Sequence, residues 1–201
     1  MQLENDIENC LAVLQTGGII LYPTDTVWGI GCDATDEQAV KRIFKLKERP
    51  EEKSMVILLA DEKDILNYVD HPNLMMFDYI KGINKPTTMI YNGAKNLAPS
   101  LISKEGSIAI RLVQDPFCRQ IIKKLGKPLV STSSNISGFP TPRTFSDIDI
   151  RIKKGVDYIV HHRQEENEPA EPSTIIKVNR SEEHTSELQS HSDLVCRLLL
   201  E

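Results

Sequence analysis

Two short stretches of the chain gather side chains that could bind an anion. The first, "KLKERPEEK", places Lys47, Arg49 and Lys53 around one proline, and the second, "STSSN" (131–135), directly follows an apolar run. Arginine offers a planar fork of donors and lysine a point charge, and both suit phosphate or carboxylate groups. Small hydroxyl and amide side chains at a strand end suit an anion or the edge of a base. Together the two stretches predict an anion site.

Each stretch also has an ordinary structural interpretation. Basic side chains such as Lys45 and Lys47 at a helix C-terminus complement the partial negative charge of the helix dipole. Serine and asparagine in a turn often bond their own backbone. The histidines His161 and His162 flank an acidic loop, where a solvated surface position is the expected one. Neither stretch therefore defines a site when it is considered alone.

Hydrophobic spacing and turn residues predict the elements that position these side chains. Lys47 and Arg49 are expected on the last turn of a helix that Thr35 or Asp36 caps, and "PTDT" (23–26) is expected in a loop at a strand end. Further helices are predicted over about 3–16, 62–69, 74–81, 116–124 and 146–154. Strands are predicted at 19–22, 55–60, 87–91, 107–113, 128–133, 158–162 and 173–178. This alternation predicts an α/β domain with a mixed sheet.

Composition excludes several classes of protein. The 201 residues are 40% hydrophobic and 26% charged, which is typical of one ordinary globular domain, predicted here to cover residues 1–179. No stretch approaches the roughly 20 apolar residues of a membrane span, so we expect a cytoplasmic protein with no membrane partner. The four cysteines are scattered without CxxC spacing, and the common nucleotide and hydrolase motifs are absent from the sequence.

The last residues, 180–201, differ in character from the rest. "RSEEHTSELQSHSDLVCRLLLE" has no strand alternation and resembles the translation of sequencing-adapter DNA, so we interpret it as a non-native tail. The alternative is an amphipathic C-terminal helix that would use its leucines. Without this segment the chain loses five acidic and two basic side chains and is nearly neutral.

Five stretches in this order and spacing resemble the YrdC/TsaC family of threonylcarbamoyl-AMP synthases. They are "LYPTDTVWGIGCD", "KLKERPEEKSM", "SIAIRLV", "KPLVSTSSNISG" and "PSTII". The resemblance covers residues 7–178 and includes a KxR element at 47–49 and an SxN element at 133–135 behind the PTDT loop. It implies a twisted mixed β-sheet flanked by helices, with a concave ligand cavity.

The resemblance also implies an activity. The family condenses L-threonine, bicarbonate and ATP into threonylcarbamoyl-AMP and pyrophosphate, for the threonylcarbamoyladenosine modification of tRNA. Lys47 and Arg49 would be catalytic. Threonine would be held by Thr26, Arg111, Ser131 and Ser173. ATP would be held by Arg49, Lys53, Ser107, Ser133, Asn135 and Thr141. Mg²⁺ is expected to arrive with ATP, and the expected partners are tRNA or RNA and the proteins that transfer the threonylcarbamoyl group.

The sequence departs from the family pattern at two places. Leu58 stands where many members have a histidine, and the suspected tail replaces a last strand that ends in a nucleotide-contacting arginine. Two other functions compete with the synthase: an RNA-binding module, and a paralogue of the YciO branch without this activity. The nearly neutral charge and the 5% aromatic content argue against an RNA-binding module, and the intact KxR and SxN elements argue against the paralogue.

Overall fold

The computed structural model describes residues 2–50, 53, 55–72, 85–166 and 173–177. The predicted helix at 74–81 and the suspected tail at 180–201 lie outside these residues. In chain order the elements are α1 (Gln2–Gln15), β1 (Ile20–Tyr22), β2 (Gly29–Gly31), α2 (Glu37–Leu46), β3 (Val56–Leu59), η1 (Glu62–Asp64), α3 (Ile65–Tyr68), β4 (Thr87–Asn92), η2 (Pro99–Leu101), β5 (Ser107–Leu112), α5 (Pro116–Leu125), β6 (Leu129–Ser133), α6 (Ile150–Gly155), β7 (Tyr158–Ile159) and β8 (Thr174–Lys177).

The helices that carry or neighbour the candidate residues begin at acidic caps. The Asp36 carboxylate accepts two backbone N–H groups of the first turn of α2, and Asp115 accepts the amide of Cys118 at the start of α5. The α5 helix ends at Gly126, whose φ of 69° is the left-handed conformation that glycine adopts without strain. Both helices begin where the sequence predicts them.

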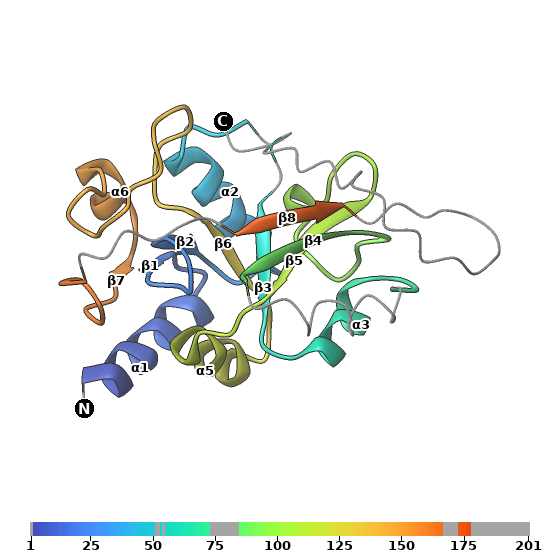
Figure 1. Cartoon of the computed structure of the whole chain (residues 1–201), viewed down its shortest axis with the longest axis horizontal. Helices are drawn as coiled ribbons and strands as arrows, with labels where there is room; N and C mark the ends of the chain where they lie inside the picture. Colours follow the sequence, from blue (N-terminus) through green and yellow to red (C-terminus); the bar gives the residue numbers. More distant parts are fainter. Residues whose placement is uncertain (1, 51–52, 54, 73–84, 167–172, 178–201) are drawn as a thin grey trace.

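The strands form one mixed sheet in the order β7-β1-β2-β6-β3-β5-β4-β8. The pairs β1–β7, β3–β5 and β4–β8 are parallel, and the other four neighbouring pairs are antiparallel. The predicted α/β class with a mixed sheet is therefore confirmed. The KxR and SxN stretches follow α2 and β6, so their proximity depends on how α2 docks near the middle of this sheet (Figure 1).

Strand β2 is the element that the sequence prediction missed. Its three residues Gly29–Gly31 contain only one side chain, that of Ile30, between two glycines, yet they pair with β1 on one side and β6 on the other. A Cβ at Gly31 would lie 2.5 Å from the Val130 carbonyl oxygen and 2.7 Å from the Tyr22 ring. Glycine is therefore required here because the neighbouring backbone and ring approach too closely for any side chain.

The two faces of the sheet differ in size and polarity of side chains. On one face lie Ile57, Ile110 and Val130, which are at most 2% exposed. The other face, which we call the open face, carries the partly exposed Val56, Ser107, Ala109, Ser131 and Ser133. Directly paired residues of adjacent strands share a face, so these small side chains line one continuous surface.

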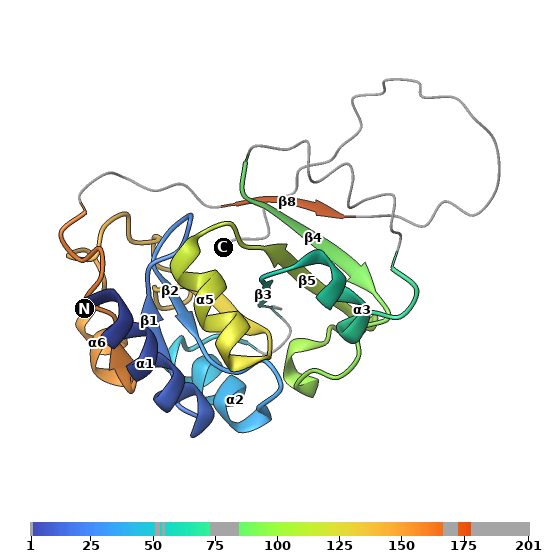
Figure 2. The same cartoon turned by 90° about the horizontal axis from the view of Figure 1, so that it is seen from below.

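Helices α1 and α5 pack against each other and cover the apolar face (Figures 1 and 2). The buried side of α5 consists of Phe117, Cys118, Ile121 and Ile122, which join the core cluster. Because this apolar burial stabilises the domain from one side, small and polar side chains are tolerated on the other. The candidate site can therefore occupy the open face.

Two predicted elements are shorter than expected. The last predicted helix begins at Ile150 and not at Ser146, because the Thr144 amide and hydroxyl bond Asp147 in a turn. Strand β7 ends at Ile159, because the buried carboxylate of Asp6 accepts the backbone amides of His161 and His162. Local side-chain to backbone bonds decide both boundaries.

Candidate active site

The KxR element lies at the end of α2 in a Schellman motif. Lys47 is the C-cap, the amide of Arg49 donates to the Phe44 carbonyl at 2.9 Å, and the amide of Glu48 donates to Lys45 at 3.1 Å. Glu48 takes the left-handed position with a φ of 50°, where glycine is usual. Arg49 was expected on the last helical turn and lies beyond it. The motif turns the chain after Lys47, so that the Lys47 side chain is buried whereas that of Arg49 is half-buried on the following turn.

Lys47 is almost fully buried and joins α2 to the SxN loop. Its ammonium donates to the backbone carbonyls of Ser133 and Asn135, the latter at 2.7 Å, and its own carbonyl accepts the amide of Ser137 at 2.8 Å. Burial lowers the pKa of Lys47 to about 7, and the nearby charge of Arg49 adds to this effect. The helix-dipole interpretation of Lys47 is therefore wrong, because its ammonium serves the loop.

The SxN element is held together by its own side chains. The Ser133 hydroxyl donates to Asn135 Oδ1 at 2.5 Å, and the Asn135 amide donates to the carbonyls of Phe139 at 2.7 Å and Ile136 at 3.1 Å. Ser134 is fully buried, and its hydroxyl has no hydrogen-bond partner within the described part of the chain. The loop thus has a defined shape that Lys47 attaches to α2.

Arg49 and Lys53 lie on the turn that leads from α2 to β3. Arg49 is half-buried, its Nε donates to the Lys53 carbonyl at 2.9 Å, and burial lowers the pKa of its guanidinium. Lys53 is exposed. Two of the three cations predicted around this turn, Arg49 and Lys53, therefore lie on it, whereas the ammonium of Lys47 is directed to the SxN loop.

Sheet register places Ser107 at the same end of the open face as Ser133. Val56 pairs with Ala109 on one side and with Ser131 on the other. Ser107 comes two residues before Ala109 on β5, and Ser133 comes two residues after Ser131 on β6. Because β5 is parallel and β6 antiparallel to β3, the two serines lie at the same height on either side of β3. The Ser107 hydroxyl lies 2.7 Å from that of Ser103. This end of the sheet is the one that the turn with Arg49 and Lys53 enters.

Arg111 lies toward the other end of the open face and is 4% exposed. Its Nη1 donates to the Thr26 hydroxyl at 2.9 Å, and its Nη2 lies 3.2 Å from Asp25 Oδ1. The Nε–H is buried and has no acceptor among the described residues. Since an unsatisfied buried donor is costly, this donor favours a site where a ligand carboxylate completes the arginine.

A chain of hydrogen bonds connects Arg111 through the Thr26 and Thr24 hydroxyls to the backbone of the PTDT turn. Thr24 Oγ1 accepts the Thr26 amide at 3.0 Å, lies 2.9 Å from Thr26 Oγ1 and donates to the Val27 carbonyl. Each hydroxyl has a single proton, so Thr26 donates to Thr24 while it accepts from Arg111. Thr26 then has one lone pair left for a ligand donor such as an ammonium or hydroxyl group.

Ser173 joins this end of the site through a residue that sequence reasoning missed. Thr88 on β4 pairs with Arg111 on β5, and its hydroxyl lies 2.9 Å from that of Ser173. Leu58 on β3 pairs with Arg111 on the opposite side and is fully buried. Thr88 and Asp25 could not be identified from spacing, because only the β4–β5 register and the fold of the PTDT turn place them beside Arg111.

Ser131 lies on the open face between the two groups. It is partly exposed, and a Cβ at Gly29 would lie 3.4 Å from its hydroxyl oxygen. The neighbouring Tyr22 is fully buried and donates to the Val130 carbonyl, and burial raises the pKa of its phenol. Because Gly29 of β2 has no side chain, nothing projects from this strand position beside the Ser131 hydroxyl.

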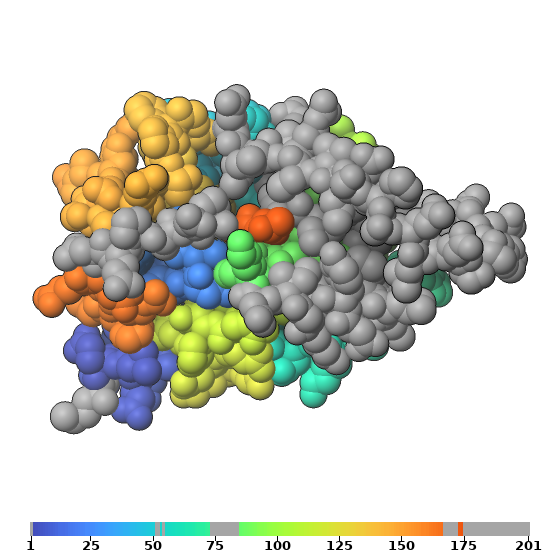
Figure 3. Space-filling model, viewed as in Figure 1, coloured from blue at the N-terminus to red at the C-terminus, as the bar shows by residue number. Residues whose placement is uncertain are grey.

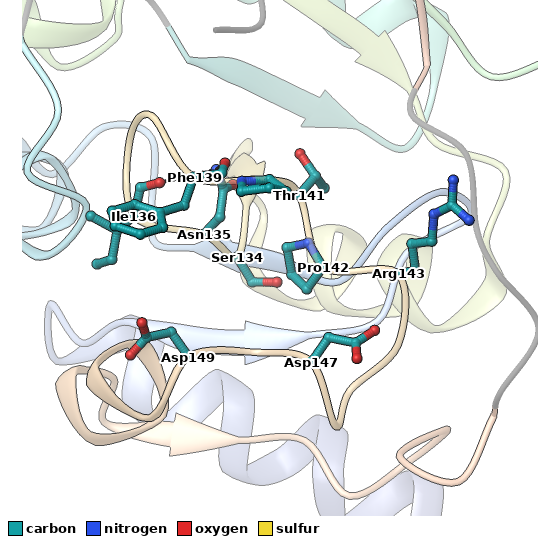
Figure 4. A pocket seen from close by; sticks show the side chains of 10 residues that line it. Ser134, Asn135, Ile136, Phe139, Thr141, Pro142, Arg143, Asp147 and Asp149 are labelled. Carbon is teal, nitrogen blue, oxygen red and sulfur yellow. Dashed lines mark hydrogen bonds between the residues drawn. The ribbon is translucent and has the colours of Figure 1, made fainter.

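Thr141 lines a pocket of about 420 Å³ on the loop after β6. In Figure 4 the segment from Ser134 to Arg143 lies on one side of this pocket, and Asp147 and Asp149 lie on the other. The loop forms part of a gold lobe that is well separated from α5 (Figure 3). Asn135 shares the pocket with Thr141, whereas Arg49, Lys53 and Ser107 do not line it.

The described residues contain no group of three or more His, Cys, Asp or Glu side chains that could hold a metal ion. Among the same residues, no helix is long and apolar enough to cross a membrane. All eleven predicted site residues lie within the described part. One group consists of Arg111 and Thr26, with Ser173 linked to them through Thr88, and a second lies around the KxR and SxN elements, with Thr141 in the adjoining pocket.

Comparison with known proteins places this arrangement in a family. Residues 12–187 match the Sua5/YciO/YrdC family model, which is described as "Telomere recombination". A protein of Pseudoalteromonas translucida named threonylcarbamoyl-AMP synthase is 32% identical over 178 residues, which are 87% of this chain and 94% of the relative. The protein of the same name from Photobacterium profundum is 30% identical over 159 residues, 78% of this chain and 86% of the relative.

Solved structures show the same fold at lower identity. E. coli YciO has a TM-score of 0.76 at 24% identity, and the match covers 90% of this chain and 86% of YciO. P. abyssi Sua5, in a complex with L-threonine, has a TM-score of 0.75 at 23% identity over 86% of this chain and 50% of that longer chain. From its matching family model and its relatives, the chain belongs to the Sua5/YciO/YrdC family.

Proposed function

We propose that the chain is a threonylcarbamoyl-AMP synthase, which condenses L-threonine, bicarbonate and ATP into threonylcarbamoyl-AMP and pyrophosphate. The curated relatives described above carry this name. The observation that carries the proposal is Arg111, a buried arginine with an unused Nε–H, on the same open face as the SxN element. A carboxylate at Arg111 and phosphates at the KxR turn are the two anionic ends that this reaction requires.

The amino-acid half of the site is the group around Arg111. The threonine carboxylate would accept from Arg111 Nε, and the remaining lone pair of Thr26 would accept from the ammonium or hydroxyl group. The Thr88 and Ser173 hydroxyls, 2.9 Å apart, offer further partners for the threonine side chain. Asp25 keeps the guanidinium in place from the opposite side. Leu58 supplies an apolar wall beside the same arginine.

The nucleotide half is the group at the other end of the open face. From Ser107 to Arg111 the strand advances four residues, or about 13 Å, which leaves room for a carbamoylated amino acid next to a phosphate chain. Arg49, Lys53, Ser107, Ser133, Asn135 and Thr141 would contact ATP. We propose that Lys47 fixes the SxN loop against α2 and does not contact ATP, because its ammonium already donates to two carbonyls of that loop.

The reaction joins these halves in an in-line displacement. The amine of threonine and bicarbonate give a carbamate with loss of water, and a carbamate oxygen then attacks the α-phosphorus while pyrophosphate leaves. The protein contributes alignment and positive charge for the phosphoryl oxygens and the leaving group. No side chain has to act as a proton-transferring base at the phosphorus, which agrees with a set of predicted site residues that contains no histidine.

Mg²⁺ would enter with ATP, since the described residues contain no acidic cluster for it. When bound, it would neutralise charge on the phosphates. The product is a mixed anhydride, so we also propose partners that consume it: proteins that transfer the threonylcarbamoyl group to tRNA, and tRNA or RNA itself. ATP as a substrate, and tRNA as the final acceptor of the threonylcarbamoyl group, support a cytoplasmic location.

The proposal is tested by pyrophosphate release from the purified chain. We expect release only when threonine, bicarbonate and ATP are all present, together with a product of the mass of threonylcarbamoyl-AMP. Release that does not depend on threonine would reject the assignment. RNA binding without this reaction, with a steep dependence on salt and none on ATP, would favour the RNA-binding module instead.

A further inference from the structure

The segment after β7 starts a long crossing of the molecule. Strands β7 and β8 are the two edges of the sheet, so the chain between Ile159 and Thr174 connects opposite edges. Arg163 lies near the start of this crossing, beside the PTDT turn. It has no assigned role in the reaction, and its contacts reach two parts of the domain that lie far apart in sequence.

The guanidinium of Arg163 joins the PTDT turn to the first turn of α5. Its Nη1 donates to the Thr24 carbonyl at 3.0 Å and to Asp115 Oδ2 at 3.1 Å, and its Nε donates to Glu166 at 2.6 Å. The other oxygen of Asp115 accepts the Cys118 amide that begins α5. The turn is therefore tied through one side chain to a helix that is packed into the core.

The backbone of Arg163 is held in an unfavourable conformation. Its φ is 68°, in the left-handed region that non-glycine residues seldom occupy. A residue remains there only when surrounding contacts over-determine its position, and such positions concentrate at functional sites. For Arg163, the hydrogen bonds of its side chain to Thr24, Asp115 and Glu166 hold the backbone in this conformation.

The turn that Arg163 holds carries the residues that hold Arg111. Thr24 accepts the amide of Thr26, and Thr26 and Asp25 contact the Arg111 guanidinium. We infer that Arg163 is a positioning residue for the amino-acid half of the site, acting through the Thr24 carbonyl to fix Thr26 and Asp25 around Arg111. This inference rests on the proposed function, because it assigns Arg163 to threonine and not to ATP.

The test compares Arg163→Gly with a matched control. Glycine removes the guanidinium and adopts the left-handed φ without strain. Arg42 is the control, because it also donates to a carbonyl, that of Gly17 at 3.1 Å, and to a carboxylate, that of Asp157 at 2.9 Å, away from the site. Loss of a charge-assisted contact predicts that Arg163→Gly raises the KM for threonine roughly tenfold or more, with the KM for ATP unchanged. Arg42→Ala should change neither constant.

The inference is overturned if Arg163→Gly changes the threonine KM no more than Arg42→Ala does, or if the KM for ATP rises in parallel. Arg163→Lys keeps the charge without the fork, so it should also raise the threonine KM, and an unchanged value contradicts the inference. If Arg163→Gly does not fold, Arg163→Lys provides the test.

A second readout does not depend on activity. Hydrogen exchange of the amides in residues 24–28 should be faster in Arg163→Gly than in the wild type and unchanged in Arg42→Ala. Equal protection in all three proteins would overturn the positioning role even if the chain turned out not to bind threonine. Absence of threonine binding to the wild type would instead overturn the proposed function.

Discussion

Replacing Lys47 by methionine tests the electrostatics of the link between α2 and the SxN loop. The side chain is 1% exposed, and its ammonium donates to two carbonyls. Methionine has nearly the same length and is apolar, so it removes the charge and both donors with little change in volume. The variant leaves the two loop carbonyls without a donor, which lowers the unfolding free energy by about 1–3 kcal/mol for each. It also removes the cost of burying a charge.

The size of that cost follows from the pKa. Burial lowers the pKa of Lys47 from 10.5 to about 7. One pKa unit corresponds to 1.36 kcal/mol, so the charged form in the folded state costs about 5 kcal/mol at or below pH 7. The two acceptors cost about 2–6 kcal/mol together and removal of the charge gains about 5 kcal/mol, so we expect the unfolding free energy at pH 7 to change by between a loss of about 1 and a gain of about 3 kcal/mol.

The pH dependence gives the decisive result. Between pH 7 and 10.5 the unfolded chain keeps the Lys47 proton while the folded chain has lost it, so unfolding takes up a proton and stability rises with pH. Methionine cannot titrate. The unfolding free energy of the wild type minus that of Lys47→Met should therefore increase by about 2–3 kcal/mol from pH 7.5 to 9.5.

Urea denaturation at pH 7.5, 8.5 and 9.5 measures this difference, with the single tryptophan, Trp28, as the fluorescent probe. All other titrating groups are shared by the two proteins and cancel in the difference. Lys45→Met is the control, because Lys45 is exposed on the same helix end. A difference that stays constant with pH would refute the reasoning, since it would mean that the two carbonyls keep the buried ammonium fully charged. The turnover rate should fall in Lys47→Met and not in Lys45→Met.

Four further outcomes are expected. Arg111→Lys cannot replace the contacts to Thr26 and Asp25 and the unused Nε–H together, so calorimetry should show threonine affinity lower by ~10-fold or more, whereas Arg119→Lys, at the surface pair with Asp61, should leave it unchanged; equal affinities would remove Arg111 from the site. Thr88→Val should weaken threonine binding without affecting that of ATP, because it breaks the contact with Ser173, and a parallel loss of both affinities would contradict this. Glu48→Gly should raise the unfolding free energy by about 0.5 kcal/mol because Glu48 has a positive φ, while Lys45→Gly inside α2 should lower it; a destabilised Glu48→Gly would argue against the cap. Chelation of Mg²⁺ should stop pyrophosphate release but leave threonine calorimetry unchanged, and release that persists without the ion would reject a metal-assisted reaction.

Spacing and turn chemistry were sufficient for most elements. The apolar residues Ile7, Cys10, Leu11 and Leu14 recur at helical spacing and predict α1, and Asp115-Pro116 predicts the start of α5, because caps and periodicity are local properties. Strand β2 was missed because its two glycines carry no pattern. Its existence depends on pairing with β1 and β6, which is a non-local interaction.

The site was predicted as a set of residues and not as an arrangement. The motifs were sufficient to predict Arg49, Arg111 and Asn135 as site residues. The burial of Lys47 could not be inferred, since a lysine at a helix end is usually solvated. Thr88 and Asp25 were missed for the related reason that register and loop shape, not spacing, place them beside Arg111.

By itself the sequence determined which residue types are available for the chemistry: two clusters of cations and hydroxyls, one arginine in a strand and an α/β pattern of elements. Only the tertiary structure decided which of these side chains bond other parts of the chain and which stay partly exposed on the open face. Sheet register set Ser107 level with Ser133 and Thr88 beside Arg111, and the docking of α2 turned Lys47 inward to the loop carbonyls. The physical reason is that a side chain's type fixes which bonds it can make, whereas burial and neighbours brought in from distant sequence fix which of those bonds it does make.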